Sequence, residues 1–129
     1  MSVRCAALSA LADFGTHARP AIPLLIRCLV DDSVEVQMSA LRTLGFLRLE
    51  PTLVVPALTT CVQDSAKEAS AHSREALAVL VLGRYGKAAE STVPLILPLL
   101  EDSHLDLRRS ATNALKEIAP EKIQATTGK

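Results

Sequence analysis

Apolar side chains recur along this chain in a pattern typical of one side of an α-helix. In four similar segments they fall at i, i+4, i+5 and i+8, apart from His72 and Thr112, and this spacing places them on one helix face. Each segment ends on a leucine, and we take Leu11, Leu44, Leu80 and Leu115 as equivalent positions. The segment therefore recurs every 33 to 36 residues, which indicates a repeated helical unit.

A second kind of segment alternates with the first and carries a proline near its start. Each of these prolines is followed eight residues later by an aspartate, and the prolines are Pro23, Pro56 and Pro94. They predict helix starts, because the N–H that proline lacks would be unpaired in a first turn. The residues that follow the aspartates have the spacing of a capping box: Asp32 with Glu35, Ser65 with Glu68, and Ser103 with Asp106. We therefore expect a very short turn between two antiparallel helices in each unit.

This alternation from Val3 to Ile118 resembles the HEAT repeat, including the shorter HEAT-like form of prokaryotic proteins. Armadillo repeats, with three helices in a longer period, fit less well. The resemblance implies an all-α fold: a right-handed α-α superhelix, or HEAT-like solenoid, of about seven helices. In that family an aspartate and an arginine form a hydrogen-bonded ladder. Asp102 and Arg108 match it, whereas Gln37 and Ser73 stand where the other arginines are expected.

The pattern predicts a single repeat domain at 1–119 and a polar C-terminal tail at 120–129. Within the domain we expect a leading helix and then three helix pairs, at 2–14, about 20–48, 51–85 and 91–119. Three extra residues after Asp64 predict a longer turn or a longer helix. Gly83 and Gly86 allow a positive φ at the next join, and Pro98 predicts a kink or a late helix start.

Composition narrows the classes of function for this 129-residue chain. The formal net charge is zero and there is no Trp, so the basic, aromatic-rich surface of a nucleic-acid binder is not expected. No apolar run approaches the roughly 18 residues of a membrane-spanning helix. No signal peptide is apparent, and three cysteines, an odd number, favour the cytoplasm.

Motifs for catalysis and metal binding are absent from the sequence: it has no Gly-rich phosphate loop, GxSxG, HExxH or paired CxxC. The cysteines and histidines are spaced too widely to predict a zinc site. HEAT-like families also include iron hydroxylases, alkylpurine DNA glycosylases and phycobilin lyases. However, the histidines here are not followed by glutamate, and the chain is short for a chromophore cleft. We expect a non-enzymatic protein without a cofactor.

Surface recognition is the remaining class, and the resemblance places the second helix of each pair on a concave surface. Positions opposite the apolar stripe lie six and two residues before the anchoring leucine and one after it. The candidate binding residues among them are Met38, Arg42, Arg74, Arg109, Asn113 and Lys116. Arginines in such a row bind acidic side chains through charge-assisted hydrogen bonds. We expect a protein partner, which is acidic unless Glu35, Glu75, Asp106 and Glu117 neutralise the row.

Two other interpretations remain open. Apolar residues on the first helices, such as Leu24 and Leu95, are either shared between adjacent repeats or form a contact strip. The chain is alternatively a structural or self-associating segment of a larger HEAT solenoid, or an accessory or regulatory subunit related to HEAT-like lyases. Because residues 3–14 are nearly all apolar, we expect a homo-oligomer through the N-terminal helix or a chain that continues upstream.

Overall fold

The structure is a computed structural model that describes residues 3–68 and 72–122. Every regular element in these two ranges is a helix, as the periodicity predicted. The elements, with α for α-helix and η for 3₁₀-helix, are α1 Val3–Leu11, η1 Ala12–Ala21, α2 Ile22–Cys28, α3 Val34–Leu47, α4 Pro51–Ala66, α5 His72–Arg84, η2 Gly86–Thr92, α6 Val93–Ile96, η3 Leu97–Glu101 and α7 Leu105–Ile118. Most of the expected tail, residues 123–129, lies outside the described residues.

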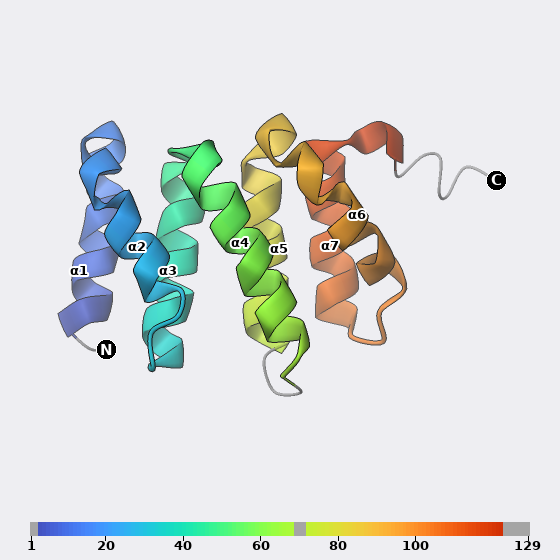
Figure 1. The fold of residues 1–129 in the computed structure, drawn as a ribbon, viewed down its shortest axis with the longest axis horizontal. Coiled ribbons are helices and arrows are strands. Elements are labelled where there is room, and N and C mark those ends of the chain that lie inside the picture. Colours follow the sequence, from blue (N-terminus) through green and yellow to red (C-terminus); the bar gives the residue numbers. More distant parts are fainter. Residues whose placement is uncertain (1–2, 69–71, 123–129) are drawn as a thin grey trace.

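The helices form two layers that run side by side along the molecule (Figure 1). α1, α3, α5 and α7 make one layer, in which each helix packs against the next, and α2, α4 and α6 make the other. Fully buried side chains come from both layers, among them Ile22, Leu44, Leu58 and Ile96. Burial of this apolar surface holds the layers together, so the chain is an all-α solenoid of stacked helix pairs.

The register of α5 differs from the prediction. α3, α5 and α7 begin at Val34, His72 and Leu105, and alignment on these starts pairs Leu44 with Leu82 and Leu115. All three leucines are 0% exposed, whereas Leu80, the predicted anchor, is 42% exposed. The prediction was wrong because residues 76–82 are apolar without interruption, so the sequence alone does not show which of them face the core.

Two of the three predicted capping boxes are replaced by other hydrogen bonds at the short turns. Ser33, not Asp32, caps α3, because its Oγ accepts from the Val36 N–H at 3.4 Å. Before α7, the carboxylate of Asp102 accepts from the His104 N–H at 2.8 Å, and Ser103 is not the cap.

The third predicted box is absent because Ser65 lies inside α4, which continues to Ala66. The extra residues of this unit thus lengthen the helix by part of a turn. Ser65 is fully buried there, and its hydroxyl accepts from the Arg74 side chain of α5 at 2.8 Å instead of capping a helix.

Prolines mark two of the three predicted helix starts. Pro23 and Pro94 are the second residues of α2 and α6. Pro56 lies inside α4, which begins at Pro51 instead. The kink predicted at Pro98 is present: α6 ends two residues earlier, and the chain continues as the 3₁₀ segment η3.

The leading helix α1 ends at Leu11, earlier than predicted, and a 3₁₀ segment follows it. Within that segment Gly15 has a φ of 55° and a ψ of −131°, which a residue with a Cβ rarely adopts. Leu8 is buried against α3, and its carbonyl accepts from Thr43 Oγ1 at 3.1 Å. A substitution at Leu8 therefore tests packing inside the chain and not an outer face of α1.

Two glycines allow close contact within the α3, α5 and α7 layer. A Cβ on Gly83 would lie 2.7 Å from Ala114 Cα, and one on Gly45 would lie 3.1 Å from Val81 Cγ2. Gly83 thus serves close helix packing and not the positive φ that the sequence suggested, which belongs to Gly86 with a φ of 57°. Of the helices in the described ranges, none combines the length and apolar character needed to cross a bilayer.

Candidate functional site

The outward side of α3, α5 and α7 carries side chains at four-residue spacing, one row from each helix. With the register of the structure, the α3 row of Met38, Arg42 and Phe46 corresponds to Arg109, Asn113 and Glu117 on α7. On α5 the row consists of Leu80 and Arg84, because Ala76, at the position of Met38, is buried. Residues four apart in a helix share a face, so the rows lie side by side. We name this surface the α3/α5/α7 face.

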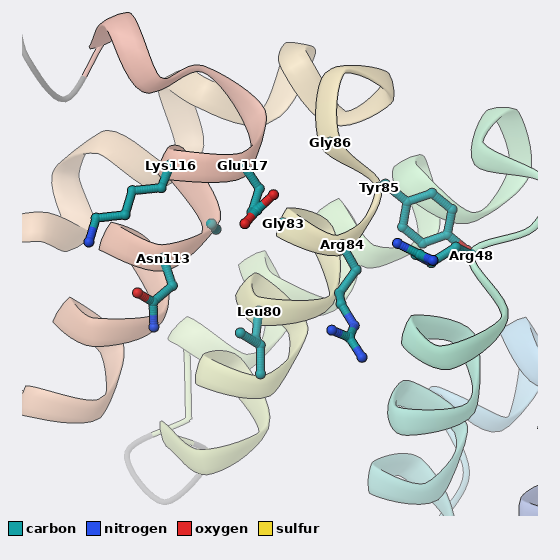
Figure 2. Close-up of a pocket in the computed structure, with 10 residues that line it drawn as sticks. Arg48, Leu80, Gly83, Arg84, Tyr85, Gly86, Asn113, Lys116 and Glu117 are labelled. Carbon is teal, nitrogen blue, oxygen red and sulfur yellow. The ribbon is translucent and has the colours of Figure 1, made fainter.

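Two neighbouring hollows indent this face. The larger, of about 560 Å³, lies between α5 and α7 and is lined by Arg48, Leu80, Arg84, Asn113, Lys116 and Glu117 among others. Figure 2 shows Leu80 and Arg84 on α5 across from Asn113 on α7, with the Glu117 carboxylate between the two helices and the Lys116 side chain directed away from α5. The smaller, of about 270 Å³, lies between α3 and α5 and is lined by Arg42, Phe46, Leu77, Leu80 and Arg84 among others. Leu80 and Arg84 line both hollows.

The face carries more positive than negative charge. Exposed cations lie on or beside all three helices: Arg42, Arg48, Arg84, Arg109 and Lys116. Within the described ranges none of these five belongs to an ion pair. Of the four groups expected to neutralise the row, Glu75 is buried at the start of α5, whereas Glu35, Asp106 and Glu117 are exposed, and Glu117 lies in the larger hollow. The five cations therefore outnumber these exposed carboxylates. The cations are therefore available to a ligand.

Apolar groups are exposed among these cations. Phe46 is 63% exposed and Leu80 is 42% exposed. Because both lie at the rim of the hollow between α3 and α5, the α3/α5/α7 face combines an apolar part with a cationic one.

Arg74 does not belong to this face, contrary to the prediction. Its side chain is 14% exposed, and Nε donates to Ser65 Oγ at 2.8 Å while Nη1 donates to Gln37 Oε1 at 2.6 Å. Its remaining nitrogen pairs with Glu68, and Gln37 in turn donates to the carbonyl of Asp31. Arg74 thus forms the polar ladder between repeats that was expected from Arg108. Asp102 bonds to His104 instead of Arg108.

The other predicted binding residues lie on the α3/α5/α7 face. Arg42, Arg109, Asn113 and Lys116 are exposed, and Met38 is half-buried. Phe46 was missed because each predicted row ended one position after the anchoring leucine, and Arg84 was missed also because the α5 row was aligned on Leu80 instead of Leu82. In the structure the row continues at the second position, and the first holds the packing glycines Gly45 and Gly83.

Tyr85 fixes the end of α5 against the turn between α3 and α4. Its hydroxyl donates to the Leu49 carbonyl at 2.9 Å, and burial raises the pKa of Tyr85 to about 12. In that turn Arg48 and Glu50 both have a φ of 52°, and the Arg48 N–H donates to the Leu44 carbonyl at 2.9 Å. This arrangement places Arg48 at the rim of the larger hollow (Figure 2).

A separate polar cluster joins the starts of α5 and α7. The rings of His72 and His104 stack with centroids 3.5 Å apart, and His104 Nδ1 lies 2.9 Å from Asp102 Oδ1. Hydrogen bonds from the main chain and ring of His104 lower the pKa of Asp102. Burial raises the pKa of Glu75, and the charge of Asp102 raises it further. In the part of the chain that the structure describes, no three His, Cys, Asp or Glu side chains are grouped to hold a metal ion.

Comparison with known families agrees with this architecture. The family model described as HEAT repeats matches residues 2–78, and the one described as HEAT repeat matches residues 92–121. No curated protein and no solved structure shows a significant match to the chain. The segment between the two matched regions includes the second half of α5, where the register departs from the sequence period. On these matches, and with paired helices in two layers, the chain belongs to the HEAT-repeat family.

Proposed function

We propose that this chain is a non-enzymatic scaffold that binds an acidic protein partner on the α3/α5/α7 face. HEAT repeats generally mediate protein–protein interactions, which gives the class of function. We choose this surface because exposed cations surround Phe46 and Leu80, and within the described residues none of these cations belongs to an ion pair. Exposed apolar groups bordered by arginines are typical of protein interfaces.

The apolar and the cationic side chains of this face make different kinds of contact with a partner. Phe46 and Leu80 lose contact with water when a partner covers them, which favours association. Arg42 and Arg84 bind carboxylates in two-pronged geometry, which lysine does not reproduce. The partner is therefore a protein surface with both apolar and acidic side chains. We place the complex in the cytoplasm because an odd number of cysteines, three, suits a reducing compartment, and the thiol of Cys61 is buried and free.

A second candidate function is self-association through α1. Ala6, Ala7 and Ala10 are exposed on this end helix, and Phe14 in the following segment is 58% exposed. A second copy, or a neighbouring repeat of a longer solenoid, covers such a surface.

The test of the proposed face uses random peptides displayed on phage and selected on the immobilised chain. The selected peptides are then synthesised, and their binding is mapped by ¹H–¹⁵N chemical-shift changes. We expect acidic peptides that also contain apolar residues, with shift changes on the outward sides of α3, α5 and α7. Peptides that shift mainly α2 and α4 resonances contradict the choice of face.

A matched pair of variants sharpens this test. Replacing Arg42, Arg84 and Arg109 with glutamine should abolish binding of the selected peptides and leave the far-ultraviolet circular dichroism unchanged, because all three are exposed. The control replaces three cations that are exposed elsewhere on the molecule, Arg27, Lys67 and Lys87, with glutamine, and it should bind as the unmodified chain does. Equal loss in both variants contradicts a specific role for the face and leaves only net charge as the cause.

A further inference from the structure

The two hollows of the α3/α5/α7 face differ in chemistry although they share a wall. The hollow between α3 and α5 is lined mainly by the apolar residues Phe46, Leu77, Leu80 and Val81, and its charged lining residues are Arg42 and Arg84. The hollow between α5 and α7 is bordered by Arg48, Arg84 and Lys116, with Glu117 as the acidic group among its lining residues. Apolar side chains make up most of the first lining, and in the second the three cations outnumber the single acidic group, so the first hollow suits an apolar side chain and the second suits a carboxylate.

The shared wall sets how far apart these two side chains must be. Leu80 and Arg84 stand one turn apart on α5 and form a ridge between the hollows. Each hollow lies between adjacent helices, so the distance between the hollows is close to one interhelical spacing, roughly 8–10 Å. A helix laid across α5 meets this ridge with its full width. An extended chain is narrower, so it can cross the ridge and place one side chain in each hollow.

Extended chains in the polyproline II conformation match this spacing. They rise about 3.1 Å per residue and bring residues i and i+3 to the same side, about 9 Å apart. A fully extended β-strand directs residues three apart to opposite sides, so it does not fill both hollows in this way.

Resting on the proposed function, we infer that the partner presents an extended segment with a bulky apolar residue three positions from an aspartate or glutamate. The apolar side chain occupies the hollow between α3 and α5. The carboxylate occupies the hollow between α5 and α7, where the Arg84 guanidinium binds it and Arg48 adds positive charge. Asn113, also in that hollow, is available to donate its amide N–H groups to the same carboxylate.

The probes are synthetic peptides of Gly, Ser and Pro that carry one leucine and one aspartate separated by one to six positions in either order. Binding is measured by fluorescence anisotropy at physiological salt. We expect affinity to peak at a separation of three. At that separation, replacing the peptide leucine with alanine or its aspartate with asparagine should each weaken binding about tenfold or more.

Double-mutant cycles assign each contact to its hollow. Leu80→Ala should remove the benefit of the peptide leucine, and Arg84→Gln should remove the benefit of the peptide aspartate. Leu24→Ala is the matched control, because Leu24 is 47% exposed on α2 against 42% for Leu80 on α5. Arg27→Gln is the control for Arg84→Gln. Neither control should change affinity. Circular dichroism of every variant shows whether it is folded.

The outcomes separate this inference from the proposed function. Binding that depends on Arg84 but not on the leucine, or that is equal at all separations, overturns the two-hollow arrangement and leaves an acidic partner in place. Best binding by a helical peptide of the same composition also overturns it. If no acidic peptide binds and the selected phage peptides map to another surface, the proposed function fails as well.

Discussion

Gly83→Ala tests whether the spacing of α5 and α7 is fixed by main-chain contact. The added Cβ would lie 2.7 Å from Ala114 Cα and 3.0 Å from Ala114 Cβ. Carbon atoms in contact lie about 3.5–4.0 Å apart, so the two helices must separate by about 1 Å. The nearer atom belongs to the backbone, and no change of rotamer relieves the overlap.

The expected loss combines two opposing terms. Overpacking in a close-packed interior costs roughly 1–3 kcal/mol, and a backbone overlap belongs in the upper part of this range. Alanine gains about 1 kcal/mol over glycine in a helix interior. The free energy of unfolding should therefore fall by about 1–2 kcal/mol. Helix propensity alone predicts the opposite sign.

Urea unfolding followed by far-ultraviolet circular dichroism measures this change through the midpoint and slope of the transition. Gly45→Ala is the control in the neighbouring pair of helices. Its Cβ would meet Val81 Cγ2 at 3.1 Å, a methyl group that can move by a few tenths of an ångström. We expect its stability to stay within about 0.5 kcal/mol of the unmodified chain. If Gly83→Ala is as stable as the unmodified chain, the close-contact argument is refuted.

Three further predictions follow from burial and charge. Leu44→Ala should cost about 2–5 kcal/mol in urea unfolding, because Leu44 is fully buried, and a cost under about 0.5 kcal/mol contradicts that placement. Glu75→Gln should raise the melting temperature at pH 7, because burial disfavours the ionised carboxyl and raises its pKa; the gain should vanish below about pH 4, where the unfolded carboxyl is also protonated, and a gain unchanged by pH argues against it. If α1 mediates self-association, Ala10→Glu should lower the mass measured by light scattering without loss of helicity, whereas Leu8→Glu should unfold the chain; an oligomer unaffected by Ala10→Glu contradicts this interface.

The fold was predictable from the sequence where polar residues or prolines show which side of a helix is buried or where the helix ends. The stripe of α7 is clear because polar residues flank each buried position, and Pro98 fixes the change to a 3₁₀ segment. The register of α5 was not predictable, since residues 76–82 are apolar on every side of the helix. In that helix close packing through Gly83, and not the pattern of polarity, decides which side faces the neighbours.

The residues of the candidate site were predictable on helices whose register was predicted correctly, and not on α5. Arg109, Asn113 and Lys116 were placed on the outward face because the α7 stripe was aligned correctly. Arg74 was assigned to that face through the misaligned Leu80. Its true position depends on α4 continuing past Ser65, which brings that hydroxyl within reach. A side-chain contact between two helices leaves no periodic signal in the sequence.

The left-handed backbone of Arg48 and Glu50 has a consequence for how this chain can change. A residue with a Cβ loses roughly 1 kcal/mol in that conformation, and glycine avoids the loss. Arg48→Gly should therefore stabilise the helix end, but it removes a cation from the rim of the larger hollow. At position 48, unlike position 50, the chain can thus gain this stability only by losing a cation of its candidate interface. Variants selected for thermal resistance alone should accumulate at this turn, and their affinity for acidic peptides should fall as their melting temperature rises.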